Sequence, residues 1–194
     1  MTSLSREFAR LKLSVSAEIE QKLQSYIDEL RRWNARINLT ALEGQDLYRR
    51  LVAEPLWIGR QLQMSGTLLD LGSGNGSPGI PLYLGCCLER ADLVEARVKR
   101  AAFLRHVASR LQASGIVVHR SRLEDMEVPS EAVNWITMQG VKPGTNVVAA
   151  MQRLFQSTTR VVWITSGASD VTASENLVVP ESSTIVRVLQ LDQF

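Results

Sequence analysis

Apolar side chains recur every three or four residues in the first third of the chain. Between 16 and 33 they fall on one face of a helix, with Ser16 placed to cap its start. Glu18 and Glu20 stand in the first turn, where the helix dipole favours acidic groups. A second helical stretch runs over 46–63. The pattern therefore predicts helices that lie against another part of the protein.

From residue 67 onward short apolar runs alternate with helical stretches. We expect strands at 67–71, 91–95, 116–119, 133–138 and 160–165, and helices at 79–88, 97–113 and 145–156. Such alternation is typical of a mostly parallel sheet with helices on both faces. Only four residues separate the runs at 176–179 and 184–191, too few for a helical crossover, so we expect an antiparallel last strand.

Composition excludes several classes of protein. The 194 residues are 45% hydrophobic and 22% charged, which is ordinary for a globular chain and argues against disorder. A net charge of +2 excludes nucleic-acid binding by bulk charge but not a local basic patch. Two adjacent cysteines and two histidines predict no metal site. No apolar run approaches the roughly 18 residues of a membrane span, and no targeting signal is evident, so we expect a cytoplasmic protein.

A glycine-rich loop follows the first predicted strand, with glycines at 72, 74 and 76. A dinucleotide-binding loop needs Gly-x-Gly-x-x-Gly, but the third position counted from Gly72 is Ser77. No Gly-Lys-Ser/Thr follows, which excludes a Walker loop. The remaining pattern, Asp70-x-Gly-x-Gly-x-Gly, resembles motif I of S-adenosylmethionine-dependent methyltransferases. That cofactor has no phosphate, so an acid nearby is tolerable. A tight turn without a ligand is the alternative.

Two later positions agree with this cofactor. Glu95 ends the second predicted strand, where an acid can hold ribose hydroxyls. Leu123 lies in the loop after the third strand and can contact the adenine face, while backbone groups near Leu123 and Glu124 can read its edge. An ordinary exposed acid is the alternative for Glu95. The predicted fold is therefore α/β, a Rossmann-like methyltransferase of one domain, with a helical extension at 1–64 and a core at 65–194.

Four stretches make the chain similar to the RsmG (GidB) family, whose members methylate the N7 atom of a guanine in bacterial 16S rRNA. They are Trp33–Thr40, the glycine loop with its Pro-Gly-Ile-Pro tail at Leu69–Pro81, Glu95–Arg105 and Ser121–Glu124. The resemblance implies S-adenosylmethionine as cofactor and small-subunit rRNA, or an assembling small subunit, as partner. The cofactor-binding residues expected from motif and resemblance together are Gly72, Gly74, Ser77, Glu95, Leu123, Glu124 and Gln139.

The chain departs from the family pattern at three polar positions. Gln139 stands where the family has an arginine, and Gln cannot supply a bidentate charge. Ser166 replaces a lysine that precedes a glycine, and Leu51 replaces a histidine in the second helix. These changes leave a different target or a loss of activity open.

Guanine N7 already carries a lone pair, so its methylation needs alignment rather than a general base, and we predict no catalytic acid or base. The residues expected to contact RNA are Arg36, Asn38, Arg97, Lys99 and Arg100. A solvated helix face is the alternative for the cations, and a turn cap for Asn38. Two other functions stay open: a methyltransferase for another RNA or a small molecule, and an inactive cofactor-binding module on the ribosome.

Overall fold

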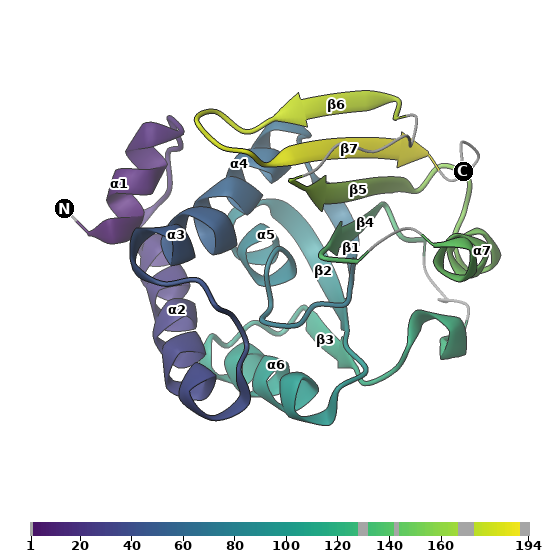
Figure 1. The fold of residues 1–194 in the computed structure, drawn as a ribbon, viewed down its shortest axis with the longest axis horizontal. Helices are drawn as coiled ribbons and strands as arrows, with labels where there is room; N and C mark the ends of the chain where they lie inside the picture. Colours follow the sequence, from purple (N-terminus) through teal and green to yellow (C-terminus); the bar gives the residue numbers. More distant parts are fainter. Residues whose placement is uncertain (1, 128–131, 142–143, 167–172, 191–194) are drawn as a thin grey trace.

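Seven strands form one sheet in the computed structural model, which describes residues 2–127, 132–141, 144–166 and 173–190. The strands are β1 (Ser65–Leu71), β2 (Cys87–Val94), β3 (Ile116–His119), β4 (Trp135–Gln139), β5 (Arg160–Thr165), β6 (Glu175–Val178) and β7 (Ile185–Gln190). Their order is β3-β2-β1-β4-β5-β7-β6 (Figure 1). β1 to β5 run parallel, and β7 is antiparallel to both β5 and β6, as predicted.

The helices come mainly before and between the strands. They are α1 (Ser3–Arg10), α2 (Ala17–Ile37), α3 (Gly44–Tyr48), the π-helix η1 (Arg49–Ala53), α4 (Glu54–Gln61), α5 (Gly79–Gly85), α6 (Val98–Arg110), the 3₁₀ turn η2 (Leu123–Asp125) and α7 (Thr145–Leu154). Among the described residues, no helix is long and apolar enough to cross a membrane. The same residues contain no cluster of three metal-ligating side chains.

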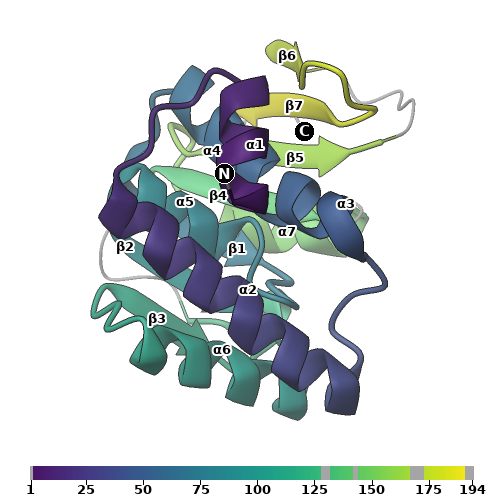
Figure 2. The same cartoon turned by 90° about the vertical axis from the view of Figure 1, so that its left-hand side faces the viewer.

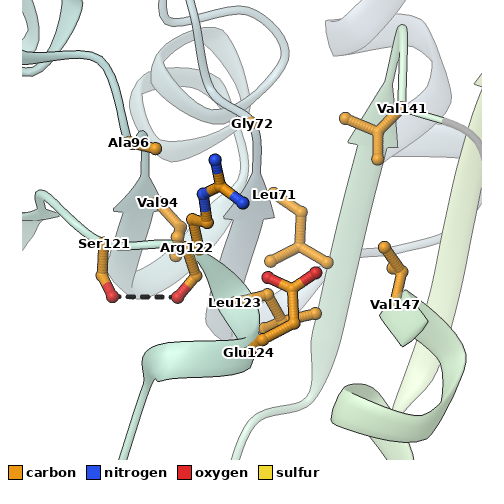
Figure 3. A pocket seen from close by; sticks show the side chains of 10 residues that line it. All are labelled: Leu71, Gly72, Val94, Ala96, Ser121, Arg122, Leu123, Glu124, Val141 and Val147. Atoms are coloured by element: carbon orange, nitrogen blue, oxygen red, sulfur yellow. Dashed lines mark hydrogen bonds between the residues drawn. The ribbon is translucent and has the colours of Figure 1, made fainter.

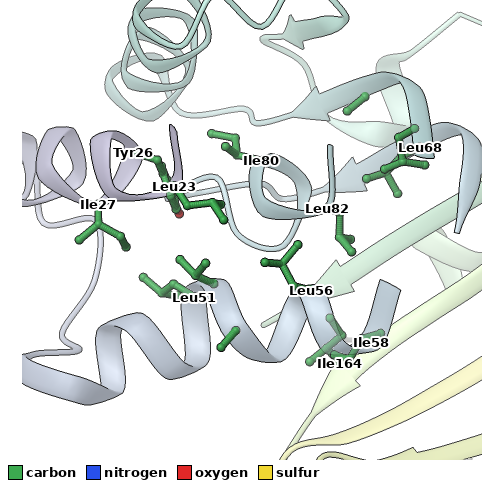
Figure 4. Packing of buried hydrophobic residues seen from close by; sticks show 14 of the residues in the cluster. Leu23, Tyr26, Ile27, Leu51, Leu56, Ile58, Leu68, Ile80, Leu82 and Ile164 are labelled. Carbon is green, nitrogen blue, oxygen red and sulfur yellow. The ribbon is translucent and has the colours of Figure 1, made fainter. Parts of the chain in front are cut away.

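The two faces of the sheet are covered unequally. One face packs against α4, α5 and α6, with α1 and α2 outside them (Figures 1 and 2). Leu23 of α2, Leu56 of α4, Ile80 of α5 and Leu68 of β1 belong to this core (Figure 4). On the opposite face, the helical residues in the core come from α7 and η2. The helices before β1 thus share a hydrophobic core with the sheet.

The parallel register brings the strand ends that carry the glycine loop to one edge. Leu71 pairs with Val94 of β2 and with Met138 of β4. Just beyond, the N–H groups of Gly72 and Ser73 both donate to the Val94 carbonyl, at 2.9 and 3.0 Å. The loop is therefore fixed between β1 and β2, at the carboxyl edge where open α/β sheets bind ligands.

Several element boundaries differ from the sequence prediction, and three differences have a clear structural cause. The helix predicted over 46–63 is divided into α3, η1 and α4, because a π-turn interrupts the α-helical hydrogen bonds. The helix predicted over 79–88 ends at Gly85, because Cys87 already pairs with Ser65 in the sheet. The pattern also gave no helix at α1, whose Leu4 and Phe8 are buried in the shared core.

Candidate functional site

A cavity of about 250 Å³ opens at the carboxyl edge of the sheet. Its walls come from the ends of β1 and β2, the loop after β3 and the segment after β4, and they include Leu71, Gly72, Val94, Leu123, Glu124 and Val141 (Figure 3). Most of these side chains are apolar, while Arg122 and Glu124 supply opposite charges. We call it the cofactor cavity.

Gly72 must stay small for this cavity to exist. Its φ is +69°, which L side chains rarely adopt, and a Cβ there would lie 2.8 Å from Cγ2 of Val141. Gly74 also has a positive φ, of +52°. The positive φ values explain the glycines at these positions, and the contact at Gly72 shows that backbone forms that wall.

Glu95 holds the glycine loop in place through hydrogen bonds to backbone N–H groups. Its buried carboxylate accepts hydrogen bonds from the N–H groups of Gly74, at 3.1 Å, and Arg97, at 2.7 Å. It thus ties the loop to the start of α6. The cavity walls include its neighbours Val94 and Ala96 but not Glu95 itself. A contact between Glu95 and ribose stays a prediction.

Asp70 lies beneath the loop and is only 1% exposed. Oδ1 accepts a 2.7 Å hydrogen bond from the Thr137 hydroxyl, whereas Oδ2 has no hydrogen-bond partner among the described residues. Burial raises the pKa of this carboxyl to about 6, against the opposing effect of the Thr137 hydrogen bond. The sequence placed Asp70 beside the cofactor, but its carboxylate is not among the groups that line the cavity.

The remaining predicted cofactor residues fall in different places. Leu123 and Glu124 line the cofactor cavity, and their contacts with the cofactor stay predictions. Ser77 is buried outside its walls, and its Oγ has no hydrogen-bond partner in the part of the chain that the structure describes. Gln139 lines a second cavity, of about 340 Å³, which meets the first at Val141. Contacts of Ser77 and Gln139 with the cofactor stay predictions.

The second cavity is also lined by another of the residues that differ from the family pattern. Ser166 lines it together with Gln139, Arg50 and Thr184. Leu51 is buried in the core next to Arg50 and does not line it. Two of the three changed positions are thus neighbours around one space.

The residues predicted to contact RNA gather at one corner. Arg36 and Asn38 lie at the end of α2, while Arg97, Lys99 and Arg100 lie at the start of α6. The Arg100 guanidinium donates to the Asn38 carbonyl at 3.4 Å, which joins the two groups. All are exposed except Arg100, which is half-buried. We call these five residues the basic corner.

Asn38 caps α2 in the left-handed conformation, with a φ of +49°. Asn34 also has a structural role: its Oδ1 accepts from the N–H groups of Leu39 and Thr40, and its Nδ2 donates to the Thr40 carbonyl. Trp33 packs edge-on against Phe103, with ring centroids 5.7 Å apart. These residues hold the turn that carries the basic corner.

Sequence reasoning did not place Arg50, Arg122 and Val141 at a cavity, although Arg50 belongs to the cations expected from the sequence to hold RNA. The signal for Arg122 was present, because it lies inside the motif at 121–124. Val141 was detectable only as the third residue after a predicted strand end. Arg50 lies far from the sheet in sequence, and no local pattern indicates where its helix docks.

The cofactor cavity suits S-adenosylmethionine chemically. Leu71, Val94 and Leu123 offer apolar surface to a flat base, and Arg122 and Glu124 can pair with a carboxylate and an ammonium group. A side chain at Gly72 would intrude, as its 2.8 Å Cβ contact shows. The residues present therefore fit this cofactor.

Solved structures agree with the fold. A SAM-dependent methyltransferase from Aquifex aeolicus is similar with a TM-score of 0.60 and 11% identity, over 84% of this chain and 97% of that one. An MtNAS variant in complex with S-adenosylmethionine is similar with a TM-score of 0.56 and 17% identity, over 89% of this chain and 77% of the other. The fold is thus that of Rossmann-like methyltransferases.

Several proteins named ribosomal RNA small subunit methyltransferase G are similar to this chain in sequence. Ribosomal RNA small subunit methyltransferase G of Cereibacter sphaeroides is 37% identical over 145 residues, 71% of this chain and 67% of the relative. The Myxococcus xanthus protein of that name is 30% identical over 158 residues, 73% of each chain. For the Chloroflexus aggregans protein the match is 39% over 105 residues, 53% of this chain and 44% of the relative. This chain thus spans from under half to about three quarters of these relatives' lengths.

The family model for rRNA small subunit methyltransferase G matches residues 19–188, which include the glycine loop, both cavities and the basic corner. The chain therefore belongs to the rRNA small subunit methyltransferase G (GidB) family.

Proposed function

We propose that this protein transfers the methyl group of S-adenosylmethionine to N7 of a guanine in small-subunit 16S rRNA. The observation that carries the proposal is the cofactor cavity at the carboxyl edge of the sheet, formed partly by the Gly72 backbone. The basic corner supports an RNA substrate, because Arg97 starts α6 directly after the Ala96 wall of this cavity.

The reaction requires no general acid or base from the chain. When bound, S-adenosylmethionine supplies a methyl group on a positively charged sulfur. The N7 lone pair forms the new N–C bond as the C–S bond breaks and its electron pair stays on sulfur. No proton leaves N7, so the chain has only to align the two atoms and exclude water. Glu95, which fixes Gly74 and Arg97, serves this alignment.

The partner in this proposal is small-subunit rRNA, free or in an assembling ribosomal subunit, and the location is the cytoplasm. Arg36, Arg97, Lys99 and Arg100 would contact phosphates, and these contacts position the RNA without reading its sequence. Base recognition then has to come from other residues near the cofactor cavity.

Methyl transfer from labelled S-adenosylmethionine tests the proposal. The purified full chain is incubated with naked 16S rRNA, with small subunits or with neither, and nucleosides are identified by mass spectrometry. We expect labelled 7-methylguanosine with at least one RNA substrate. Gly72→Val should abolish it by filling the cavity, and Gly44→Val, at an exposed glycine with φ of +54° and open space around it, is the matched control for strain. Cofactor binding without transfer to either RNA would contradict the proposal.

A further inference from the structure

The second cavity contains two polar side chains that make no hydrogen bond or ion pair within the described parts of the chain. Gln139 and Arg50 line it, and both are half-buried. Both groups are therefore available to bind a ligand that enters the cavity. A cavity of about 340 Å³ is near the lower limit of small-ligand sites.

Arg50 differs from the arginine beside it. Arg49 pairs with Glu7 at 3.2 Å and with Asp46 at 3.5 Å, whereas Arg50 points into the cavity lining without an acidic partner among the described residues. Both belong to the π-helix η1, and such turns occur often at functional sites. Because the π-turn changes the direction of successive side chains, it can direct Arg50 away from the Arg49 ion pairs.

Gln139 lines the second cavity from the sheet, and Arg50 lines it from the helix η1. Gln139 alternates with the buried Met138 along β4, so it points to the face on which η1 packs. Leu51, next to Arg50, lies in the same core cluster as Ile164 of β5, which also lines the cavity (Figure 4). Since the cavity meets the cofactor cavity at Val141, a group held here is adjacent to the cofactor site.

We propose that the second cavity binds the target guanine base, with the Gln139 carboxamide and the Arg50 guanidinium reading its polar edge. This inference rests on the proposed function and names the residues that select the base. A guanine whose N7 faces the cofactor cavity turns its N1–H and N2 amino donors away from it. A carboxamide can accept from such donors and also donate to O6, and a guanidinium can donate to O6.

Kinetics on two substrates test the reading role. Small-subunit RNA is prepared with guanine or with inosine, which lacks the N2 amino group, at the methylated position. We expect Gln139→Met and Arg50→Met to lower kcat/KM for the guanine substrate by about 10- to 100-fold, the effect of losing a base-edge contact. The affinity of Arg50→Met for S-adenosylmethionine, measured by calorimetry, should stay within twofold. Gln21→Met and Arg6→Met, at exposed sites outside both cavities, should leave both quantities unchanged.

The inosine substrate separates reading from a structural role. Wild-type protein should lose rate on inosine, whereas Gln139→Met should methylate guanine and inosine RNA at equal rates. An unchanged preference for guanine in Gln139→Met would overturn the assignment, as would wild-type rates in both cavity variants.

A binding measurement keeps the inference testable if no methyl transfer is found. Guanosine 5′-monophosphate at millimolar concentration is added to ¹⁵N-labelled protein. We expect shifts of the Gln139 side-chain amide and the Arg50 Nε resonances that are larger than those with adenosine 5′-monophosphate. No shift at either group would overturn the second-cavity assignment, whatever the result for the proposed function.

Discussion

Glu95 is a single side chain that joins two parts of the cofactor site. Its carboxylate accepts from the Gly74 and Arg97 N–H groups. We expect Glu95→Ala to weaken S-adenosylmethionine binding by about 1–3 kcal/mol, because the loop loses a charged acceptor and any ribose contact is lost with it. Calorimetry measures this, and Glu127→Ala, at an exposed acid outside the cavity, is the control. A change in binding free energy of only about 0.3 kcal/mol would mean that Glu95 does not support the site.

Asp70 gives the chain a pH-dependent stability. Because burial raises the pKa of this carboxyl to about 6, the folded chain binds its proton more tightly than the unfolded chain, where it is near roughly 4. The contribution of Asp70 to the free energy of unfolding should therefore fall as pH rises through this window, by about 2–3 kcal/mol, and then level off.

Urea unfolding at pH 4, 5, 6 and 7 measures this contribution. Asp70→Asn should lack the fall with pH that wild type shows, while Asp125→Asn, at an exposed acid, should keep it. If the free energies of unfolding of wild type and Asp70→Asn differ by the same amount at every pH, Asp70 does not titrate in this range.

The sequence predicted which segments form the site better than it predicted the directions in which their side chains point. Gly72, Leu123 and Glu124 line the cofactor cavity because they directly follow strand ends or form the loop beside them. Strand alternation sends Gln139 into the neighbouring cavity, and Ser77 is buried outside the cavity walls. These directions depend on where helices dock, which a local pattern does not contain.

Among the elements, α2 determines where the basic corner lies, and Glu29 fixes α2 to α6. The buried Glu29 carboxylate contacts His106 of α6 at 2.9 Å and Arg32 at 2.8 Å. Burial alone would raise its pKa, but the His106 hydrogen bond and neighbouring cations hold the pKa below its usual value.

We expect Glu29→Ala to lower the free energy of unfolding by about 1–3 kcal/mol, because it removes a buried charged acceptor that His106, Arg32 and Arg110 share. Urea unfolding at pH 7 measures the loss. Glu18→Ala, which removes an exposed ion pair with Lys22 on the same helix, should lower the free energy of unfolding much less, because solvent screens this pair. Equal losses in the two variants would contradict the anchoring role.

Elements defined by local pattern were predicted well. The strands at 116–119 and 160–165 agree with β3 and β5 to the residue, and Ser16 caps α2, accepting from the Ile19 N–H at 3.3 Å. Where tertiary packing decides, the prediction was wrong. The π-turn of η1 lies inside an uninterrupted helical pattern, and α1 is short, with stability that depends on burial of Leu4 and Phe8.

For the whole molecule, charge is local rather than global. The net charge is only +2, yet Arg36, Arg97, Lys99 and Arg100 gather at one corner. If these groups contact phosphates, Lys99→Ala should weaken RNA binding and reduce the slope of log K against log salt by about 1. Filter binding to 16S rRNA across a salt series measures the slope. Arg6→Ala, on the exposed side of α1, should leave it unchanged, and an equal change in the two variants would refute a specific basic corner.

The division into a helical extension at 1–64 and a core from 65 within one domain stays a prediction. It is supported by β1 beginning at Ser65 and by a hydrophobic core that includes Leu23 of α2, Leu56 of α4 and Leu68 of β1. Helices that share a core with the sheet are expected to unfold together with it.

The central claim is methylation of guanine N7, and locating the modified atom in RNA tests it most directly. Unmodified small-subunit rRNA is treated with the full chain and S-adenosylmethionine, then reduced and cleaved with aniline, which cuts the strand at 7-methylguanosine, and the cut is mapped by primer extension. The account predicts one enzyme-dependent cut, after a guanine, that disappears with Gly72→Val. Methylation at another atom, or no cut in free RNA and in small subunits, would contradict it.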